Sequence, residues 1–560
     1  MGKRIIVCCD GTWQNSVDNY VKASPKHPTA RLASPSNATR ISRSFARTCS
    51  DGTFQIIYYQ VGVGSGSGIT STFTRILGGA FGVGIAENIR EAYSYICANY
   101  VDGDEIVLLG FSRGAFTARS IAGMITNIGL LTRVGMGYFF PIFKDTQNFS
   151  KWLHLTGGRL TGEAETERAV NLDYGDPFPR LPFPDKPKGD GAVETYRKRL
   201  VAMGFTRVCQ NGEESAPIKI KAVGVWDTVG SLGIPTVPFL EKLGITRSTV
   251  EFQWYNTDLS KNIEHAFQAL ALDEVREPFS PAVWERHAAP DETIDLRQVW
   301  FPGGHSNIGG GEDDQGVSNI TLAWMMDQLA SVGIEFIPDA LDRVYNQNVA
   351  YYQQEPFAKN WAIKPIVKAN KPVRPWALHK TVQASGGLYK VLLTTPRTPG
   401  RYKKINPDTG KATKTSLEDT NERIHSSVRV RIACEGLSPG DKGEWKCPSL
   451  LAYWRPRKVM ADFHDPTATE EDASSGGSPR WIWEYAGTEA GAPAVRTMVE
   501  ENLGPYEKHL LEISGGKPSV MDYAEQFSFE DYDYPKPSKF TWDELPLDKL
   551  PLEKLKMWKR

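Results

Sequence analysis

Gly110-Phe111-Ser112-Arg113-Gly114 lies between two contrasting stretches of the chain. Residues 105–109 before it form an apolar, strand-like run, and residues 115–122 after it have the character of a helix. A strand, a G-x-S-x-G pentapeptide and a helix form, in that order, the nucleophile elbow of an α/β-hydrolase. The serine of such an elbow occupies a strained turn, and glycine on either side avoids a clash. Because the chain contains 51 glycines in 560 residues, the placement of the motif carries the prediction, not the motif alone.

The first 335 residues alternate short apolar runs with helix-length patterns, which is typical of βαβ units and a mostly parallel sheet. We therefore predict an α/β fold of the α/β-hydrolase type, a mostly parallel sheet with flanking helices, an inserted cap and a C-terminal extension. Strands are expected at residues 4–10, 55–61, 105–111, 218–226 and 296–301, and helices at about 85–100, 261–275 and 318–330.

The same pattern predicts a division of the chain. Residues 1–135 and 216–335 are expected to form the catalytic core. Residues 136–215 interrupt the alternation with an aromatic run and a proline-rich stretch, which predicts an inserted cap or lid. Residues 336–560 are expected to be a C-terminal extension, with a β-like run at 426–434 and an aromatic, arm-like tail.

Composition excludes several classes of protein. A net charge of −1 gives no case for a nucleic-acid partner. The seven cysteines lack metal-ligand spacing and indicate reduced thiols. The N-terminal apolar run is too short for a signal peptide, and no stretch reaches the length of a membrane-spanning helix. We expect a cytoplasmic protein that needs no metal or organic cofactor; its oligomeric state is open.

A nucleophilic serine needs a base, and the base needs a carboxylate to orient it. In α/β-hydrolases these residues follow the serine in the order Asp or Glu, then His. His305 follows a predicted strand on a glycine-dense loop, from which it can reach over the sheet. His265 is the competitor, on the helix expected at 261–275. We predict that His305 is the base.

Asp227 ends the fourth apolar run and is the predicted orienting carboxylate, with Asp10 and Asp273 as rivals. Asp10, Gly11 and Thr12 close the first strand, where glycine lets backbone amides approach a reacting carbonyl. The amides of Gly11, Thr12 and Arg113 are therefore the oxyanion-hole candidates, and Asp10 is a candidate supporting residue. The glycine-rich loop at 62–68 lacks the phosphate-binding patterns and is expected to form a flexible rim.

Five blocks of sequence, in order, carry a resemblance to a known family. They are residues 9–13 (CDGTW), 58–64 (YYQVGVG), 110–115 (GFSRGA), 226–231 (WDTVGS) and 301–311 (FPGGHSNIGGG). Together they resemble the DUF2235 family, which includes the catalytic domain of Tle1-type phospholipase effectors of type VI secretion. The run at 225–233 resembles fungal-type members more closely. The resemblance covers about residues 1–335 and implies an α/β-hydrolase with lipolytic or esterase chemistry, in which Ser112, Asp227 and His305 form the triad.

The expected reaction is hydrolysis of a carboxylic ester, of a lipid or phospholipid or another small molecule, through an acyl-enzyme on Ser112. Transient contact with a membrane surface through residues 136–215 is expected to accompany it. Two alternatives stay open. One is an acyltransferase or thioesterase that uses the same triad, and the other is a hydrolase-fold protein that binds without turnover.

Overall fold

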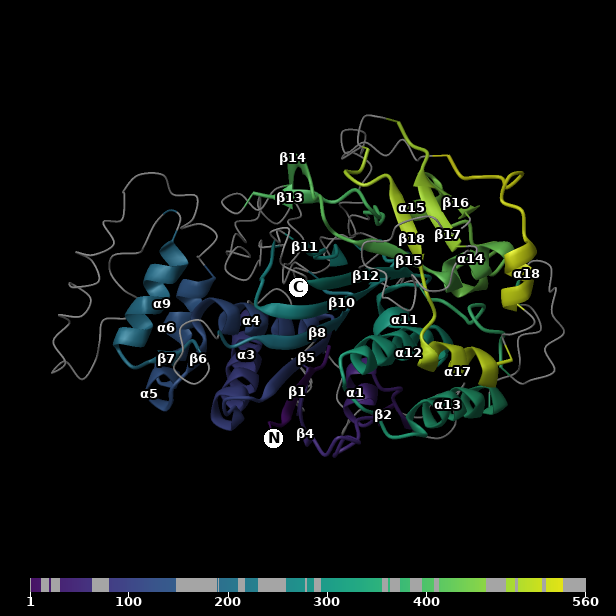
Figure 1. Cartoon of the computed structure of the whole chain (residues 1–560). Coiled ribbons are helices and arrows are strands. Elements are labelled where there is room, and N and C mark those ends of the chain that lie inside the picture. The colour runs from purple at the N-terminus through teal and green to yellow at the C-terminus, as the bar shows by residue number, and fades with distance from the viewer. Residues whose placement is uncertain are drawn as a thin grey trace, which may run out of the picture.

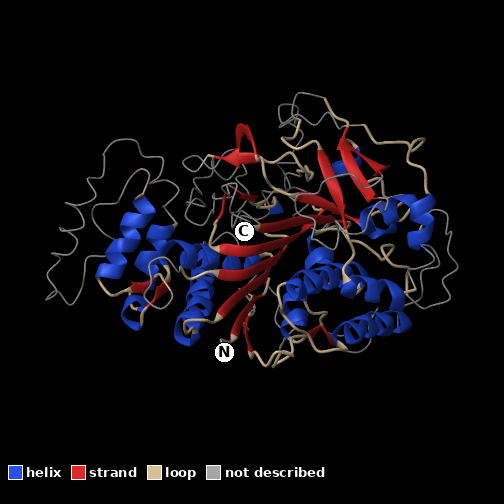
Figure 2. Ribbon diagram, in the orientation of Figure 1, coloured by secondary structure: helices blue, strands red, loops and turns tan. Residues whose placement is uncertain are grey.

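The computed structural model describes residues 2–11, 20–21, 31–62, 80–147, 189, 191–209, 217–229, 258–276, 279–286, 294–354, 361–362, 373–382, 395–406, 412–459, 480–488, 492–515 and 520–536. Ten strands of this part form one twisted sheet with helices on both faces (Figures 1 and 2). The α/β fold predicted from the sequence is therefore confirmed. No helix within the described ranges is long and apolar enough to cross a bilayer.

The sheet runs in the order β16-β17-β18-β15-β12-β10-β8-β5-β1-β4, and the eight strands from β18 to β4 pair in parallel. Only the pairs β16–β17 and β17–β18 are antiparallel. The strands are β1 (Arg4–Cys9), β4 (Gln55–Gln60), β5 (Glu105–Phe111), β8 (Ile220–Trp226), β10 (Ile263–Ala271), β12 (Asp295–Phe301), β15 (Glu422–His425), β16 (Trp454–Val459), β17 (Arg480–Tyr485) and β18 (Thr497–Glu501). Short two-stranded pairings join β2 (Tyr20–Val21) to β3 (Arg31–Leu32), β6 (Leu130–Leu131) to β7 (Thr206–Arg207), β9 (Asp258–Leu259) to β11 (Glu285–Arg286) and β13 (Lys403–Ile405) to β14 (Ala412–Ser416).

The continuous apolar runs of the strands arise because both faces of the sheet are covered. In β1, Ile5 and Val7 point into one core and Ile6 and Cys8 into the other. The first core is closed by α3 (Ala80–Asn99), α4 (Arg113–Ile128), α6 (Phe139–Thr146) and α9 (Ala192–Ala202), with α5 (Arg133–Met136) nearby. The second is closed by α1 (Asn37–Ser42), α11 (His305–Gly309), α12 (Gly316–Ser331), α13 (Ala340–Gln354), α14 (Ser426–Ala433), α15 (Pro448–Leu451), α17 (Pro505–Ile513) and α18 (Val520–Gln526); a 3₁₀ turn covers Pro439–Asp441.

Two secondary-structure predictions are wrong. The helix expected at 261–275 is strand β10, because residues 266–272 are all buried between β8 and β12 and the run has no polar face. His265 therefore lies on a strand. The β-like run at 426–434 is helix α14, whose first turn is capped by the His425 side chain accepting from Ser427 N–H. All eight of its residues are buried, so the amphipathic period of a surface helix is missing.

The regions outside the matched motifs pack onto the same body. From the 136–215 segment, α6 and α9 contact α4. Strands β15 to β18 extend the sheet itself, and the described tail packs Phe529 into the second core. The division into core, cap and extension stays a prediction, and residues 148–188 and 537–560 lie outside the described part.

The order of the strands changes direction at β1. β1 lies between β4, which follows it, and β5, which is added on the other side. Such a switch point, at the carboxyl ends of the strands, is where open α/β sheets bind ligands. Asp10 follows β1 and Ser112 follows β5 at this point.

The junction between β5 and α4 leaves no room for side chains at the two motif glycines. A Cβ on Gly114 would lie 2.1 Å from the carbonyl oxygen of Cys9, and one on Gly110 would lie 2.4 Å from the carbonyl oxygen of Gly114. Both neighbours are backbone atoms of the sheet and helix, so neither can move aside cheaply.

We therefore expect Gly114→Ala to lower the free energy of unfolding by about 2–4 kcal/mol, the range of an overpacked core. Gly103→Ala is the control, since that glycine has a φ of +93° with no atom within 4 Å of the added carbon. Backbone strain alone should cost this control about 1 kcal/mol. Denaturant unfolding measures both, and equal losses would contradict the packing argument.

Helix α12 begins against a buried histidine. A Cβ on Gly316 would lie 1.9 Å from two ring carbons of His379, which is 4% exposed. Burial lowers the pKa of His379 from 6.5 to about 4. The unfolded chain then binds a proton at higher pH than the folded chain does, so the stabilisation is present above pH 6.5 and is lost as the pH falls through about 4.

We expect the free energy of unfolding of the wild type to decline more steeply from pH 6.5 to pH 4 than that of His379→Gln, which carries no titrating ring. Urea titrations across this range measure the difference between the two proteins. Parallel pH profiles would contradict the assignment of this titration to His379.

Candidate active site

Ser112 occupies the turn predicted for it. It lies between β5 and α4 with φ 58° and ψ −119°, and its N–H donates to the Trp226 carbonyl oxygen at 3.1 Å. A positive φ is strained for any residue with a side chain and persists only where the surrounding structure enforces it. The β5–β8 register pairs Phe111 with Trp226, so Ser112 and Asp227 follow neighbouring strand ends.

Asp227 is fully buried, at 0% exposure, and has a positive φ of 42°. Its N–H donates to the Ala269 carbonyl oxygen at 2.7 Å, and its Oδ1 accepts from Ala271 N–H at 3.1 Å. Both partners belong to β10, the strand next to β8. The carboxylate is therefore fixed by main-chain bonds to a neighbouring strand, and its Oδ2 is left for other contacts.

His305 meets that oxygen. The residue begins α11, four positions after the end of β12, and its Nδ1 lies 2.6 Å from Asp227 Oδ2. Phe111 and Phe279 hold the ring, with centroid separations of 4.8 and 4.9 Å. His305 Nε2 is buried and has no hydrogen-bond partner among the described residues. Because Asp227 occupies Nδ1, the pair favours the tautomer whose Nε2 carries a free lone pair.

The two rival carboxylates have other partners. Asp273 Oδ2 accepts from Gly303 N–H at 2.7 Å, and its Oδ1 accepts from Trp445 Nε1 at 2.8 Å. Asp10 accepts from Gly11 N–H at 2.7 Å and from three hydroxyl groups at 2.6 Å, those of Ser36, Thr39 and Tyr59. Neither carboxylate contacts His305 through a described hydrogen bond, whereas Asp227 does.

Four hydrogen bonds hold the Asp10 carboxylate in place beside the turn that carries Ser112. Burial raises the pKa of its carboxyl group, and the four hydrogen bonds oppose that rise. A Cβ on Gly11 would lie 2.9 Å from Phe111 Cδ1 and 3.4 Å from Ser112 Cβ, so the Gly11 backbone runs alongside the serine. The Gly11 N–H, one of the oxyanion-hole candidates, donates to Asp10 in this structure.

The remaining oxyanion candidates differ in how far the structure describes them. Arg113 is the first residue of α4, where the positive end of the helix dipole lies. Thr12 lies outside the described residues, as do residues 63–68 of the loop at 62–68 that was expected to form a rim. Gly62, the first residue of that loop, packs against Gly11, since an added Cβ would lie 1.8 Å from the Gly11 carbonyl oxygen.

Two charged residues near His305 were missed by sequence reasoning. Glu274 Oε2 accepts from His305 N–H at 3.4 Å, and Arg397 Nη2 donates to Asp227 Oδ2 at 3.0 Å. Burial opposes ionisation of Glu274, but the hydrogen bonds and charge of Arg276 outweigh it and lower the pKa of Glu274 to about 2. Glu274 follows the mispredicted strand β10, and no motif surrounds Arg397, so neither residue carried a signal.

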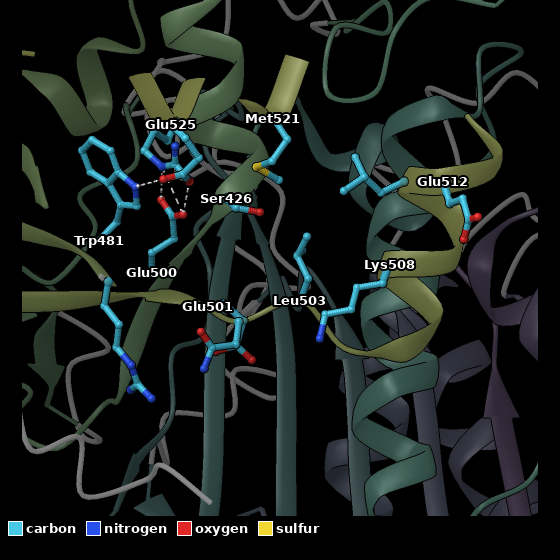
Figure 3. A pocket seen from close by; sticks show the side chains of 13 residues that line it. Ser426, Trp481, Glu500, Glu501, Leu503, Lys508, Glu512, Met521 and Glu525 are labelled. Atoms are coloured by element: carbon cyan, nitrogen blue, oxygen red, sulfur yellow. Dashed lines mark hydrogen bonds and ion pairs between the residues drawn. The ribbon is translucent and has the colours of Figure 1, made fainter. Parts of the chain in front are cut away.

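A second concave region lies away from these residues. A hollow of about 700 Å³ opens between β17, β18, α17 and α18 (Figure 3). Two of the carboxylates that line it, Glu500 and Glu525, are paired with Arg429, and none of the predicted site residues lines it. Within the described ranges, no group of three or more His, Cys, Asp or Glu side chains is placed to hold a metal ion.

The sequence of this chain is similar to that of a known family and of a yeast protein. The family described as "T6SS, Phospholipase effector Tle1-like, catalytic domain" matches residues 3–328, which is more than half of the chain. The uncharacterized protein YEL023C of Saccharomyces cerevisiae is 24% identical over 432 residues, which span 61% of this chain and 58% of the yeast protein. The chain thus covers less than two thirds of that relative.

A crystal structure of an uncharacterized protein from Pseudomonas aeruginosa aligns with 64% of this chain and 51% of its own, at 15% identity and a TM-score of 0.28. The closer resemblance to fungal-type members stays a prediction, since the yeast relative is uncharacterized. The match over residues 3–328 is sufficient to assign the family. The chain belongs to the family of Tle1-like phospholipase effector catalytic domains.

Proposed function

We propose that this protein is a serine hydrolase that cleaves carboxylic esters of lipids, with Ser112 as nucleophile, His305 as base and Asp227 as the orienting carboxylate. One observation carries the proposal: His305 Nδ1 lies 2.6 Å from the buried Asp227 Oδ2, while its Nε2 is buried without a described partner. The ring also contacts Phe111, the residue before Ser112. Membership of a phospholipase family supports a lipid ester as the substrate.

The mechanism follows from these positions. His305 Nε2 accepts the Ser112 hydroxyl proton as the oxygen attacks the ester carbonyl. Asp227 then stabilises the imidazolium through Nδ1–H, and the imidazolium protonates the leaving alcohol. Water, activated in the same way by His305, hydrolyses the acyl-enzyme. The strained φ of Ser112 fits this role because the turn presents its hydroxyl above the strand ends.

Backbone amides are proposed to hold the oxyanion of each tetrahedral intermediate. Arg113 and Thr12 supply them in this scheme. Gly11 N–H would join them by leaving or sharing its 2.7 Å hydrogen bond to Asp10, and the absence of a side chain at Gly11 would let the ester approach. Asp10 is thereby proposed as a supporting residue, not as a partner of His305.

Contact with a lipid surface through residues 136–215 stays a prediction. The described part of this segment exposes two large apolar side chains, Phe140 at 48% and Val201 at 43%.

Transfer of the acyl group to an alcohol or thiol uses the same three residues, so product analysis in the presence of such acceptors separates transferase from hydrolase. Binding without turnover would leave Ser112 unreactive, and the next experiment addresses that alternative.

Ser112→Ala should abolish reaction with a fluorophosphonate probe and turnover of acyl esters, because the attacking oxygen is removed. Intact-mass analysis should find one adduct on the wild type and none on this variant. Ser120→Ala is the matched control, since Ser120 lies in α4, the helix that follows Ser112, and its buried hydroxyl has no described partner. An adduct that persists on Ser112→Ala would refute the assignment of the nucleophile.

Asp227→Asn should lower kcat by about 10⁴-fold, the effect of the same change in other triads, because the amide no longer accepts Nδ1–H of the required tautomer. Asp273→Asn is the control, as Asp273 accepts hydrogen bonds from Gly303 and Trp445 and not from His305. Its kcat should stay within about tenfold of the wild type. A larger loss in Asp273→Asn than in Asp227→Asn would overturn the choice of carboxylate.

A further inference from the structure

Arg397 contacts the proposed site in a way that a serine–histidine–aspartate pattern does not require. Its Nη2 donates to Asp227 Oδ2 at 3.0 Å, the oxygen that His305 Nδ1 contacts at 2.6 Å. Arg397 is 3% exposed and Asp227 is 0% exposed, so water screens the pair little. Arg397 Nη1 is also buried and has no hydrogen-bond partner within the described part of the chain. The guanidinium group is thus committed to the carboxylate that orients His305.

We propose that Arg397 is a positioning residue of the hydrolase, which pairs with the Asp227 carboxylate and keeps it aligned on His305 Nδ1. This inference rests on the proposed function and extends it to the C-terminal half of the chain. A carboxylate without access to water keeps its charge only where hydrogen bonds and an opposite charge replace its hydration. Ala271 N–H supplies one of these at Oδ1, and Arg397 supplies the charge at Oδ2.

The segment that carries Arg397 is tied to both halves of the protein. On one side, Thr395 N–H donates to the Val275 carbonyl oxygen at 2.8 Å, in the loop after β10. On the other side, Gly400 N–H donates to Glu422 Oε1 at 2.8 Å, and Trp454 Nε1 donates to the Pro399 carbonyl oxygen at 3.1 Å. Glu422 and Trp454 begin β15 and β16 of the extended sheet.

Arg397 lies outside the part of the chain that matches the family. Residues 3–328 contain Ser112, Asp227 and His305, but they end before Arg397 and before both C-terminal anchors of its segment. The proposed site is therefore complete only with residues from the C-terminal half. Strands β15 to β18, which continue the sheet beyond β12, give that half a rigid support for Arg397.

The charges around His305 fix the direction of the expected pH effect. Removal of the guanidinium charge makes protonation of His305 easier, since a nearby positive charge opposes a second one. The acid limb of kcat/KM, which requires neutral His305, then moves to higher pH. Among the described residues, several charged groups face His305 or the residues that flank it. They are Asp227 at Nδ1, Arg397 against Asp227, Glu274 at the His305 N–H, Arg276 against Glu274 and Phe279, Asp273 at Gly303 and Glu312 at Ser306.

The test compares Arg397→Met, Arg397→Lys and the wild type, each full length and with kcat scaled to the sites that a fluorophosphonate labels. Arg397→Met should lose about 10- to 100-fold in kcat with little change in KM, the size of effect seen when a supporting partner is lost. Its acid limb should move to higher pH. Arg397→Lys keeps the charge, so it should leave the limb in place and recover part of kcat.

Arg374→Met is the matched control for a purely structural loss. Arg374 is likewise 3% exposed, and its guanidinium forms two bonds to Asp441. This variant should lose stability without any shift of the acid limb. The inference is overturned if the limb of Arg397→Met stays where it is in the wild type, or if its kcat falls no further than that of Arg374→Met.

Chemical rescue covers the case in which Arg397→Met fails to fold. Added guanidinium ion should restore part of kcat in Arg397→Ala and none in Asp227→Ala, because only the first variant keeps the carboxylate that binds the ion. Absence of rescue in folded Arg397→Ala counts against the inference. A wild type that the fluorophosphonate does not label would instead refute the proposed function, so the two failures are distinguishable.

Discussion

The contact between His305 Nδ1 and Asp227 Oδ2, at 2.6 Å, is the interaction on which the proposed site depends. It fixes the tautomer of the imidazole, so that Nε2 is left as an acceptor next to the elbow that carries Ser112. The two residues are 78 positions apart in the chain and are joined only because β8, β10 and β12 are parallel neighbours. The parallel sheet thus has a direct chemical result: its strand ends bring a carboxylate to a histidine.

The elbow and the carboxylate share a structural signature. Ser112 and Asp227 both have a positive φ, which costs about 1–3 kcal/mol for a residue with a side chain. The surrounding structure that enforces these turns is visible in each case. Gly110 and Gly114 allow the backbone of α4 to approach β1 and β5, while the main chain of β10 holds both the N–H and the carboxylate of Asp227. Strain at both positions is consistent with a site selected for geometry more than for stability.

The sequence was sufficient to predict five of the ten strands of the central sheet. Strands β1, β4, β5, β8 and β12 are short runs made mostly of apolar residues, and α12 was found within two residues of its true start. β10 was mistaken for a helix because its apolar residues satisfy helical spacing as well, and burial on both faces erased the difference. The prediction of a β-like run where α14 lies was wrong for the same reason, because a fully buried helix has no amphipathic period.

The candidate site was predictable in part. Ser112, Asp227 and His305 each follow a predicted strand, so topology alone suggested that they meet. Glu274 and Arg397 could not be found in this way, because their roles arise from contacts with residues distant in the chain: Glu274 accepts from His305 N–H, and Arg397 pairs with Asp227. Local pattern also gave no sign that residues 422–501 extend the sheet, since β15 to β18 are short and partly polar.

The most direct test of this account is a crystal structure of the protein after reaction with a fluorophosphonate. The account predicts phosphorus bonded to Ser112 Oγ, with His305 Nε2 within about 2.6–3.2 Å of an adduct oxygen or of the Ser112 oxygen. His305 should still contact Asp227, and Arg397 should still contact the same carboxylate. An adduct on another residue, or a His305 ring turned away from Ser112, would contradict the central claim.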